Sequence, residues 1–209
     1  MIGSLKGSAP SRRYLHQSMA LGERFDSVLV AAQTGAEWAV SSLYRDLHPA
    51  VLRYLRTQDP GEGEDLASDT WLDVARSLAR FRGNEEDFRR WVFAIARRRL
   101  IDFRRRSRRR RTDPVPAAAM NDSPASGDTE TEALEGMTTA SALARIAKLP
   151  PDQAEVVLLR VVAGFSAKEV GLMMGKRPGT VRVLQHRALA NLARDLAREP
   201  VTRWDSRAI

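Results

Sequence analysis

Twelve arginines lie within residues 89–111, where Asp102 is the only acidic residue. A guanidinium group binds phosphate through paired N–H···O hydrogen bonds, so this segment suits the backbone of a nucleic acid. On a helix of about 3.6 residues per turn, five of these arginines form one stripe: Arg90, Arg97, Arg104, Arg108 and Arg111. A solvated cationic surface is the alternative. We favour nucleic-acid contact, because so many like charges destabilise an isolated protein, although DNA and RNA are not distinguished.

Aromatic residues are interleaved with the arginines at Phe88, Trp91, Phe93 and Phe103. An aromatic ring can stack on an unpaired base, which would let this helix hold single-stranded nucleic acid. The alternative is a hydrophobic core beneath the cationic surface, in which Val92 and Ile95 complete the apolar side. For Phe88 and Trp91 we favour the core.

A second motif, within residues 166–192, has the pattern of a helix, a short glycine turn and another helix. Ser166 and Glu169 have the spacing of a capping box that starts the first helix. Gly175 suits the turn, and Pro178 is a favoured first residue for the second helix. Apolar residues recur every three or four positions along the second helix and predict its buried face: Val181, Leu184, Ala188 and Leu192.

The opposite face of this second helix carries small residues beside long basic ones: Gly179, Arg182, Val183, His186 and Ala190, flanked by Arg187. Such a face fits the major groove of DNA. Arg182 suits a guanine edge and Val183 a thymine methyl group, while Lys176 or Arg177 could hold a phosphate at the helix start. An ordinary helical hairpin with a polar outer face is the alternative, because this spacing is common.

The elements that must position these motifs are helices, and we find no credible strand pattern. The helices expected in the N-terminal part span about 24–33, 36–56 and 65–81, and a fourth runs from about 85 to past Arg105. Asp65 would be the N-cap of the third helix, and Pro49 would kink the second. In the C-terminal part, one helix starts at Pro150 and ends before Gly164.

Composition predicts an all-α fold of two small helical domains joined by a flexible acidic linker. Residues 113–137 contain six acidic residues and no lysine or arginine, unlike the segments on either side. The expected division is a flexible tail at 1–22, a first domain at 23–112, the linker at 113–137, a second domain with the helix-turn-helix at 138–199, and a tail at 200–209.

The formal charge of +8 on 209 residues indicates a polyanionic partner, with nucleic acid first and an anionic membrane surface second. Solubility alone is a third explanation. The absence of cysteine excludes disulfides, thiolate zinc sites and cysteine nucleophiles, and it fits a cytoplasmic protein. The three histidines are far apart, so we expect no metal site and no cofactor. No apolar run is long enough to span a membrane, and we expect no membrane insertion.

Both halves of the chain resemble the extracytoplasmic-function (ECF) sigma factors of the sigma-70 superfamily. In the first half the resemblance rests on DLASDTWL at 65–72 and FRRWVFAIAR at 88–97, followed by LID at 100–102 and arginines. In the second half it rests on LPP at 149–151, EVVLLR at 155–160, GTVR at 179–182 and HRA at 186–188. The joint order of these motifs is highly specific. The resemblance covers about 24–112 and 138–196.

This resemblance implies a non-enzymatic subunit that binds RNA polymerase core and directs promoter-specific transcription initiation. The first domain would bind the clamp helices of the largest polymerase subunit, through Asp65, Asp69, Leu72, Asp73 and Arg76. The acidic residues of this set lie off the predicted apolar face and have no evident local partner. The basic helix and the loop at 83–87 would hold and melt the −10 promoter element, with DNA contacts at Arg90, Trp91, Arg97, Arg98, Arg104 and Arg108.

By the same resemblance, the second domain would read the −35 element as duplex DNA and dock on the polymerase flap. Its implied DNA contacts are Lys176, Arg177, Gly179, Thr180, Arg182, Val183, His186 and Arg187. Arg98 stands where the family often has asparagine, which puts the base preference at the −10 element in doubt. Arg177 stands where the family often has a serine N-cap, so this helix start would lean on a DNA phosphate instead.

The resemblance also implies an anti-sigma protein as a further partner. It implies that the acidic linker threads the RNA channel of the polymerase; the alternative is a spacer whose acidic residues only keep it soluble. The main alternative function is a self-sufficient helix-turn-helix repressor or activator, which leaves the first domain without a role. An enzyme acting on nucleic acid is a weaker alternative. The sequence has no metal–carboxylate cluster, phosphate-binding glycine loop or nucleophile–base pair.

Overall fold

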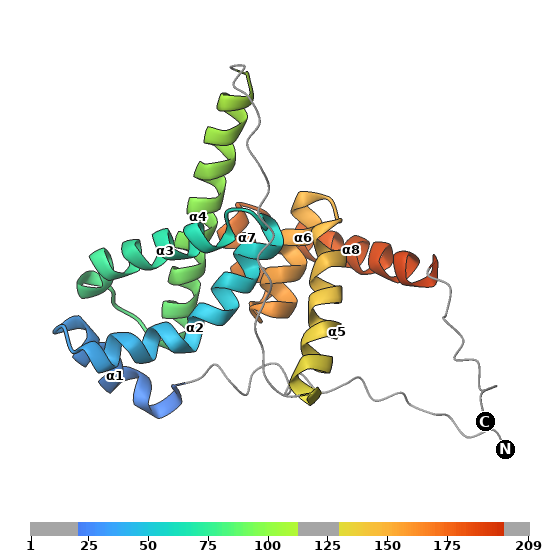
Figure 1. Cartoon of the computed structure of the whole chain (residues 1–209). Helices are drawn as coiled ribbons and strands as arrows, with labels where there is room; N and C mark the ends of the chain where they lie inside the picture. Colours follow the sequence, from blue (N-terminus) through green and yellow to red (C-terminus); the bar gives the residue numbers. More distant parts are fainter. Residues whose placement is uncertain (1–20, 113–129, 199–209) are drawn as a thin grey trace, which may run out of the picture.

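The computed structural model describes residues 21–112 and 130–198, and every regular element within these ranges is helical (Figure 1). The all-α fold class predicted from the sequence is therefore confirmed. Most of the two predicted tails, and the predicted linker over 113–129, lie outside the described residues.

The N-terminal body contains four α-helices: α1 (Phe25–Gln33), α2 (Glu37–Gln58), α3 (Gly63–Ser77) and α4 (Glu85–Thr112). One 3₁₀ turn precedes α1 at Gly22–Arg24, and another follows α3 at Leu78–Arg80. All four helices lie close to the positions expected from hydrophobic periodicity. Their contact surfaces bury Val28 on α1, Leu47 on α2, Leu66 on α3 and Val92 on α4.

The start of α3 differs from the prediction. The helix begins at Gly63 with Glu62 in the N-cap position, and no side chain caps it. Asp59 forms the preceding turn, because its Oδ1 accepts a hydrogen bond from Glu62 N at 3.3 Å. Asp65 therefore lies inside the first turn of α3 and does not cap the helix. Its negative charge interacts favourably there with the positive end of the helix dipole.

The C-terminal body contains α5 (Glu130–Ala147), α6 (Pro151–Val157), α7 (Ala167–Met174) and α8 (Pro178–Arg198). A π-helical turn at Leu158–Val162 continues α6, so this helix ends before Gly164 as predicted. The first helix, α5, begins inside the segment 113–137 that composition assigns to the linker.

The helix-turn-helix forms as its sequence predicts. Ser166 Oγ accepts from Glu169 N at 3.3 Å and Glu169 Oε2 accepts from Ser166 N at 2.7 Å, which is the reciprocal pattern of a capping box. Gly175 ends α7 in the left-handed conformation with φ +64°. Gly171 lies directly against the turn, where an added Cβ would be 2.6 Å from the Lys176 carbonyl oxygen.

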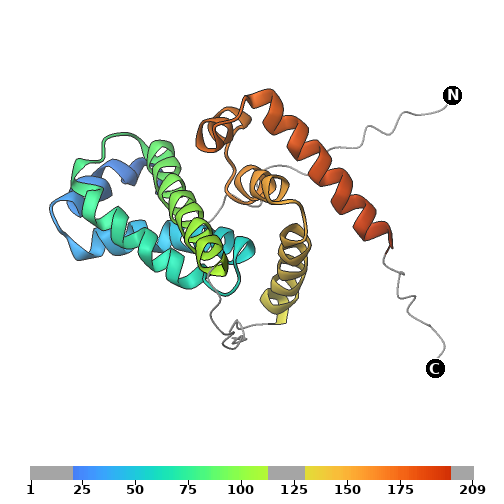
Figure 2. The same cartoon turned by 90° about the horizontal axis from the view of Figure 1, so that it is seen from above.

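The two bodies are packed against each other, which the sequence did not predict. Figures 1 and 2 show α6 and its continuation beside α2. Arg97 of α4 also donates a hydrogen bond to Glu155 of α6. Phe93 of α4 is fully buried, with its ring centroid 5.7 Å from that of Tyr54 and 5.2 Å from that of Phe165. One hydrophobic core therefore runs through both bodies, while the C-terminal half of α4 extends away from it (Figure 1).

Candidate nucleic-acid interface

The basic helix α4 starts at a well-defined cap. Asn84 Oδ1 accepts from Asp87 N at 2.9 Å, and Asp87 Oδ2 accepts from Asn84 N at 3.1 Å. These bonds satisfy two backbone donors at the end of the loop before α4. The loop is thereby held at the start of the helix that carries the arginines.

The arginines along the first part of α4 have acceptors within the chain. They are Arg89 with the Ala163 carbonyl, Arg90 with Asp87 and Glu169, Arg97 with Glu155, Arg99 with Asp73, and Arg104 with Gln58. The sequence led us to expect compensation of this charge by a bound polyanion. Part of the compensation instead comes from acidic and carbonyl groups of other helices, which periodicity cannot reveal.

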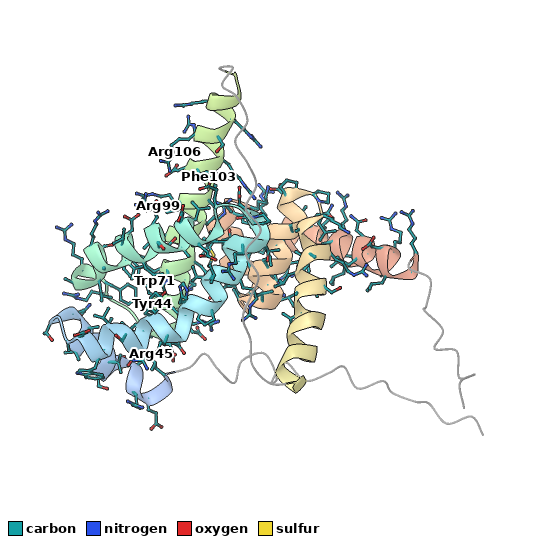
Figure 3. All side chains as sticks on the ribbon, viewed as in Figure 1. Tyr44, Arg45, Trp71, Arg99, Phe103 and Arg106 are labelled. Atoms are coloured by element: carbon teal, nitrogen blue, oxygen red, sulfur yellow. The ribbon has the colours of Figure 1, made fainter. Side chains whose placement is uncertain are left out.

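The last turns of α4 expose their arginines to solvent. Exposed positions on this segment are Arg98, Arg105, Arg106, Arg108 and Arg109, and Figure 3 shows Arg106 and Phe103 on the part of α4 that leaves the body. Ile101, Arg104 and Arg108 line a shallow hollow along this surface together with their neighbours. The predicted stripe is therefore divided: Arg104 and Arg108 come together, whereas Arg90 and Arg97 face the C-terminal body. The side chain of Arg111 lies outside the described residues.

The aromatic residues of α4 mostly serve the core. Phe88 is buried, as we favoured, and its ring lies 5.3 Å from that of Phe81. Trp91 is partly buried, 5.0 Å from Phe81 between ring centroids, and Phe103 is partly buried as well. Phe93 is fully buried. Of the four, Trp91 and Phe103 keep some surface that a base could contact.

The acidic surface of α3 has local partners, which corrects the sequence-based expectation. Asp73 Oδ2 accepts from Arg99 Nε at 2.6 Å, and Asp69 lies 3.6 Å from the same guanidinium. The hydrogen bond from Arg99 lowers the pKa of the Asp73 carboxyl below its usual value. Arg76 is 3.5 Å from Asp73. Asp65 is exposed, and so is the apolar side chain of Leu72.

The outer face of α8 is fully available to a ligand. The predicted contact residues exposed there are Gly179, Thr180, Arg182, Val183, His186 and Arg187. On the inner face Val181 and Ala188 are buried, and Leu184 and Leu192 are partly buried, which confirms the predicted orientation. Arg177 is exposed at the helix start, whereas Lys176 is half-buried and forms an ion pair with Asp152 at 2.9 Å.

Two family profiles match this arrangement, namely Sigma-70 region 2 over residues 42–110 and Sigma-70, region 4 over residues 139–192. The chain is 37% identical to the ECF RNA polymerase sigma factor ShbA of Streptomyces griseus, over 77% of this chain and 89% of that protein. It is 31% identical to the ECF RNA polymerase sigma factor SigD of Mycobacterium tuberculosis, over 82% and 83% respectively. The chain belongs to the ECF RNA polymerase sigma factors. It is a non-enzymatic factor that directs promoter-specific transcription initiation.

The fold of this sigma factor also resembles two solved complexes. A chain in the structure of CnrH with the cytosolic domain of CnrY matches with a TM-score of 0.57, 20% identity, and coverage of 83% of this chain and 97% of that one. A chain in the structure of RpoE with the anti-sigma factor NepR from Bartonella quintana matches with a TM-score of 0.56, 22% identity, and coverage of 77% and 98%. At these identities the likeness concerns the fold alone.

An aromatic patch on α2 and α3 of this sigma factor was missed by sequence reasoning. Tyr44 stacks on His48 with ring centroids 4.4 Å apart, and Trp71 lies 5.0 Å from Tyr44 (Figure 3). Burial is the main cause that lowers the pKa of His48, so the ring is neutral at pH 7. Trp38 and Leu72 are exposed on the same two helices. The four-residue spacing of Tyr44 and His48 was the available signal.

Within the described residues, no cluster of three or more potential metal-ligating side chains occurs. Nor does any helix of this part of the chain combine the length and apolar character needed to cross a membrane.

Proposed function

We propose that this ECF sigma factor binds RNA polymerase core through α3, reads the −35 element with α8 and engages the −10 element with α4. The observation that carries the proposal is the outer face of α8. There, small residues and arginines are exposed, while Val181 and Ala188 on the opposite face of the same helix are buried. The exposed face of α8 is therefore accessible and could enter the major groove of duplex DNA, as the second helix of a helix-turn-helix does.

The proposed −35 contacts are Lys176, Arg177, Gly179, Thr180, Arg182, Val183, His186 and Arg187. Arg182 and His186 are one helical turn apart on the exposed face, and Val183 provides an apolar contact between them. Arg177 directly precedes Pro178 at the start of α8. Its side chain has no oxygen atom that could accept a hydrogen bond from the first backbone N–H groups of the helix. A phosphate oxygen at this position would accept from the free backbone donors and pair with the guanidinium.

The proposed −10 contacts form two groups, one on the exposed part of α4 and one on the part that faces the core and the C-terminal body. Arg98 and Arg108 are exposed and can reach phosphates directly, and Arg104 lies beside Arg108 with a hydrogen bond to Gln58. Arg90, Trp91 and Arg97 belong to the half of α4 that faces the core and the C-terminal body. We infer that a melted strand follows α4, because stacking and phosphate contacts would offset the cost of unpairing a base.

The proposed polymerase contacts are Asp65, Asp69, Leu72, Asp73 and Arg76 on α3, which would meet the clamp helices, while the C-terminal body docks on the flap. Leu72 is 53% exposed, an apolar side chain that a protein partner would cover. Because Asp73 is bound to Arg99, we assign the direct contact first to Asp65 and Leu72. Asp69 and Asp73 would also fix the position of α4.

Further parts of the proposal concern regulation and location. The similar solved structures contain CnrH with the cytosolic domain of CnrY and RpoE with the anti-sigma factor NepR. By analogy, we infer that an anti-sigma protein binds this chain too. We also infer that the protein acts in the cytoplasm, and that the domain limits are 23–112 and 138–199 with the acidic linker between them.

Run-off transcription with purified polymerase core tests the proposed function. The chain should direct core to start at a defined promoter, and core alone should not. A gel-shift assay with the same promoter duplex, without core, tests the alternative of a self-sufficient repressor. Tight specific binding without core, combined with no stimulation of run-off transcription, would contradict the proposal.

A further inference from the structure

A pocket of about 280 Å³ opens between the end of α5 and the second half of α8. It is lined by four basic side chains: Arg145, Lys148, Arg194 and Arg198. Among the described residues that line it, Asp195 alone is acidic. Four positive charges and one negative charge leave a net charge of +3 around a small recess. Such a surface attracts an anionic ligand.

An ion pair between the two helices fixes the shape of this pocket. Arg145 Nη1 on α5 lies 2.7 Å from Asp195 Oδ2 on α8. Arg145 is the least exposed of the four basic residues, with 15% of its side chain accessible to solvent. Asp195 neutralises its charge. The excess of positive charge therefore comes from the other three basic residues.

The cations at the rim of the pocket differ in their bonding. Arg194 donates to Asn191 Oδ1 and to the Ala190 carbonyl oxygen, so its guanidinium is held along α8. Lys148 and Arg198 are exposed, and neither forms an ion pair with any described residue. Two like charges beside one recess repel each other, and a bound anion would replace this repulsion by attraction. Lys148 and Arg198 are thus the groups most available to a ligand.

The pocket also has an apolar side. Leu149 and Leu192 are both partly buried against the hydrophobic core, and together with Pro150 they line the recess. Asn191 lies beside them, where its Nδ2 donates to Gln153 Oε1 of α6 at 2.8 Å. A ligand that fits this lining carries negative charge next to an apolar group.

This lining favours an acidic peptide over a nucleotide or duplex DNA. No aromatic side chain on which a base could stack lines the pocket, as far as the described residues show. Leu192 belongs to the inner face of α8, whereas the proposed −35 contacts Arg182 and His186 are exposed on its outer face. Carboxylates suit lysine and arginine side chains, and acidic segments of proteins are recognised by such clusters.

We propose that this pocket binds an acidic peptide segment of a partner protein. Its carboxylates would pair with Lys148 and Arg198, and one apolar side chain would cover Leu149 and Leu192. The described residues that line the pocket include none of the proposed −35 contacts. The partner can therefore bind while α8 reads the −35 element, and this consequence rests on the proposed function. Its role is that of an accessory protein rather than a competitor of DNA.

Fluorescence anisotropy with the full chain and a labelled peptide measures the interaction without DNA or polymerase. The probe is fluorescein-labelled Asp-Glu-Leu-Asp-Glu-Leu. One control peptide has serine in place of leucine, and a second has asparagine and glutamine in place of the acids. Each control peptide should bind roughly fivefold more weakly than the probe, because each lacks one of the two features that the pocket matches.

Substitutions at the rim test the pocket from the protein side. Lys148→Ala with Arg198→Ala removes two exposed charges and should weaken probe binding roughly tenfold. Arg105→Ala with Arg106→Ala removes the same charge at exposed positions of α4 and is the matched control, with an expected change below about twofold. Circular dichroism verifies that both double variants are folded.

NMR spectra of the isotope-labelled chain locate the bound probe. The backbone amide signals of Leu149, Asn191 and Leu192 should shift as the probe is added. Arg182→Ala with His186→Ala should bind the probe as the wild type does, because these residues lie outside the pocket. Inorganic phosphate should displace the probe no better than sodium chloride of equal ionic strength.

Equal loss of binding in the rim variant and the α4 control would overturn the proposal, as would shifts confined to α4. Displacement by phosphate alone would show a simple anion site and overturn the assignment to a peptide. Run-off transcription with purified core separates this proposal from the proposed function. The rim variant should start transcription as the wild type does, and a reduced yield would overturn the accessory role by placing the pocket in the basal machinery.

Discussion

The carboxylate of Asp73 on α3 accepts a hydrogen bond from Arg99 Nε on α4 at 2.6 Å. This ion pair joins the helix with the proposed polymerase contacts to the helix with the proposed −10 contacts. Asp69 lies 3.6 Å from the same guanidinium and strengthens the connection. A partner that binds α3 therefore acts on a surface that is mechanically coupled to α4.

Asp73→Asn should destabilise the N-terminal body by about 1 kcal/mol at neutral pH, since it removes the charge from a partly exposed ion pair. Because Arg99 lowers the pKa of Asp73, this contribution is present above the ordinary pKa of 3.8 and is lost as pH falls through the lower folded value. Urea unfolding at several pH values measures it. Asp65→Asn is the control, and an equal loss of stability in both variants would contradict the role of Arg99.

Asp65→Lys should weaken association with polymerase core and lower the free energy of unfolding only by the lost helix-dipole interaction, about 1 kcal/mol. Asp65 is exposed in the first turn of α3, so the substitution changes the charge of the surface rather than an internal bond. Equilibrium binding to labelled core measures the effect, which we expect to be roughly tenfold at moderate salt. Glu37→Lys makes the same charge change on α2. If both variants bind core alike, Asp65 does not belong to the core interface.

Gly171→Ala should destabilise the helix-turn-helix by about 1–3 kcal/mol, because the new Cβ would meet the backbone of the turn and force the two helices apart. The Lys176 carbonyl oxygen would be 2.6 Å from that Cβ. Gly179→Ala is a matched substitution at a position with open space, and it should be neutral or stabilise α8 by up to about 1 kcal/mol. Thermal unfolding compares the two. Equal losses would show that the turn can adjust to a side chain.

Local signals in the sequence predicted the local structure well. The capping box at Ser166, the glycine that ends α7 and the proline that starts α8 each act within a few residues, and all three are present in the structure. The two faces of α8 follow from periodicity alone. The start of α3 was predicted less well, since Asp65 has a favourable cap residue type but Asp59 forms the turn.

The partners of the α4 arginines could not be predicted, because they depend on contacts between residues far apart in the sequence. Arg97 and Glu155 are separated by 58 positions, and Arg89 and Ala163 by 74. The charge pattern of one helix shows how many arginines need acceptors. It does not show which other helix provides these acceptors. Phe93 shows the same limit, since its burial depends on Phe165 from the other body.

The double variant Arg182→Ala with His186→Ala should abolish activity at promoters that depend on the −35 element while core binding stays intact. Both side chains are exposed on the outer face of α8, so their removal leaves the buried face with Val181 and Ala188 unchanged. A lost base contact costs about 1–3 kcal/mol, or roughly 5-fold to 150-fold in affinity. Arg194→Ala removes a charge further along α8 as a control. Normal run-off transcription by the double variant would refute the assignment.

Asp46→Asn should stabilise the protein above about pH 6 and have no effect near pH 4. Burial, then repulsion from Glu85, raises the pKa of Asp46 from 3.8 to about 6, while Arg89 acts in the opposite direction. The folded state thus binds a proton that the unfolded state releases between these values, and wild-type stability falls as pH rises through this window. The uncharged amide avoids that loss, by about 1 kcal/mol after solvent screening. Urea unfolding of wild type, Asp46→Asn and the exposed control Asp26→Asn measures the difference, and a gain independent of pH would contradict this explanation.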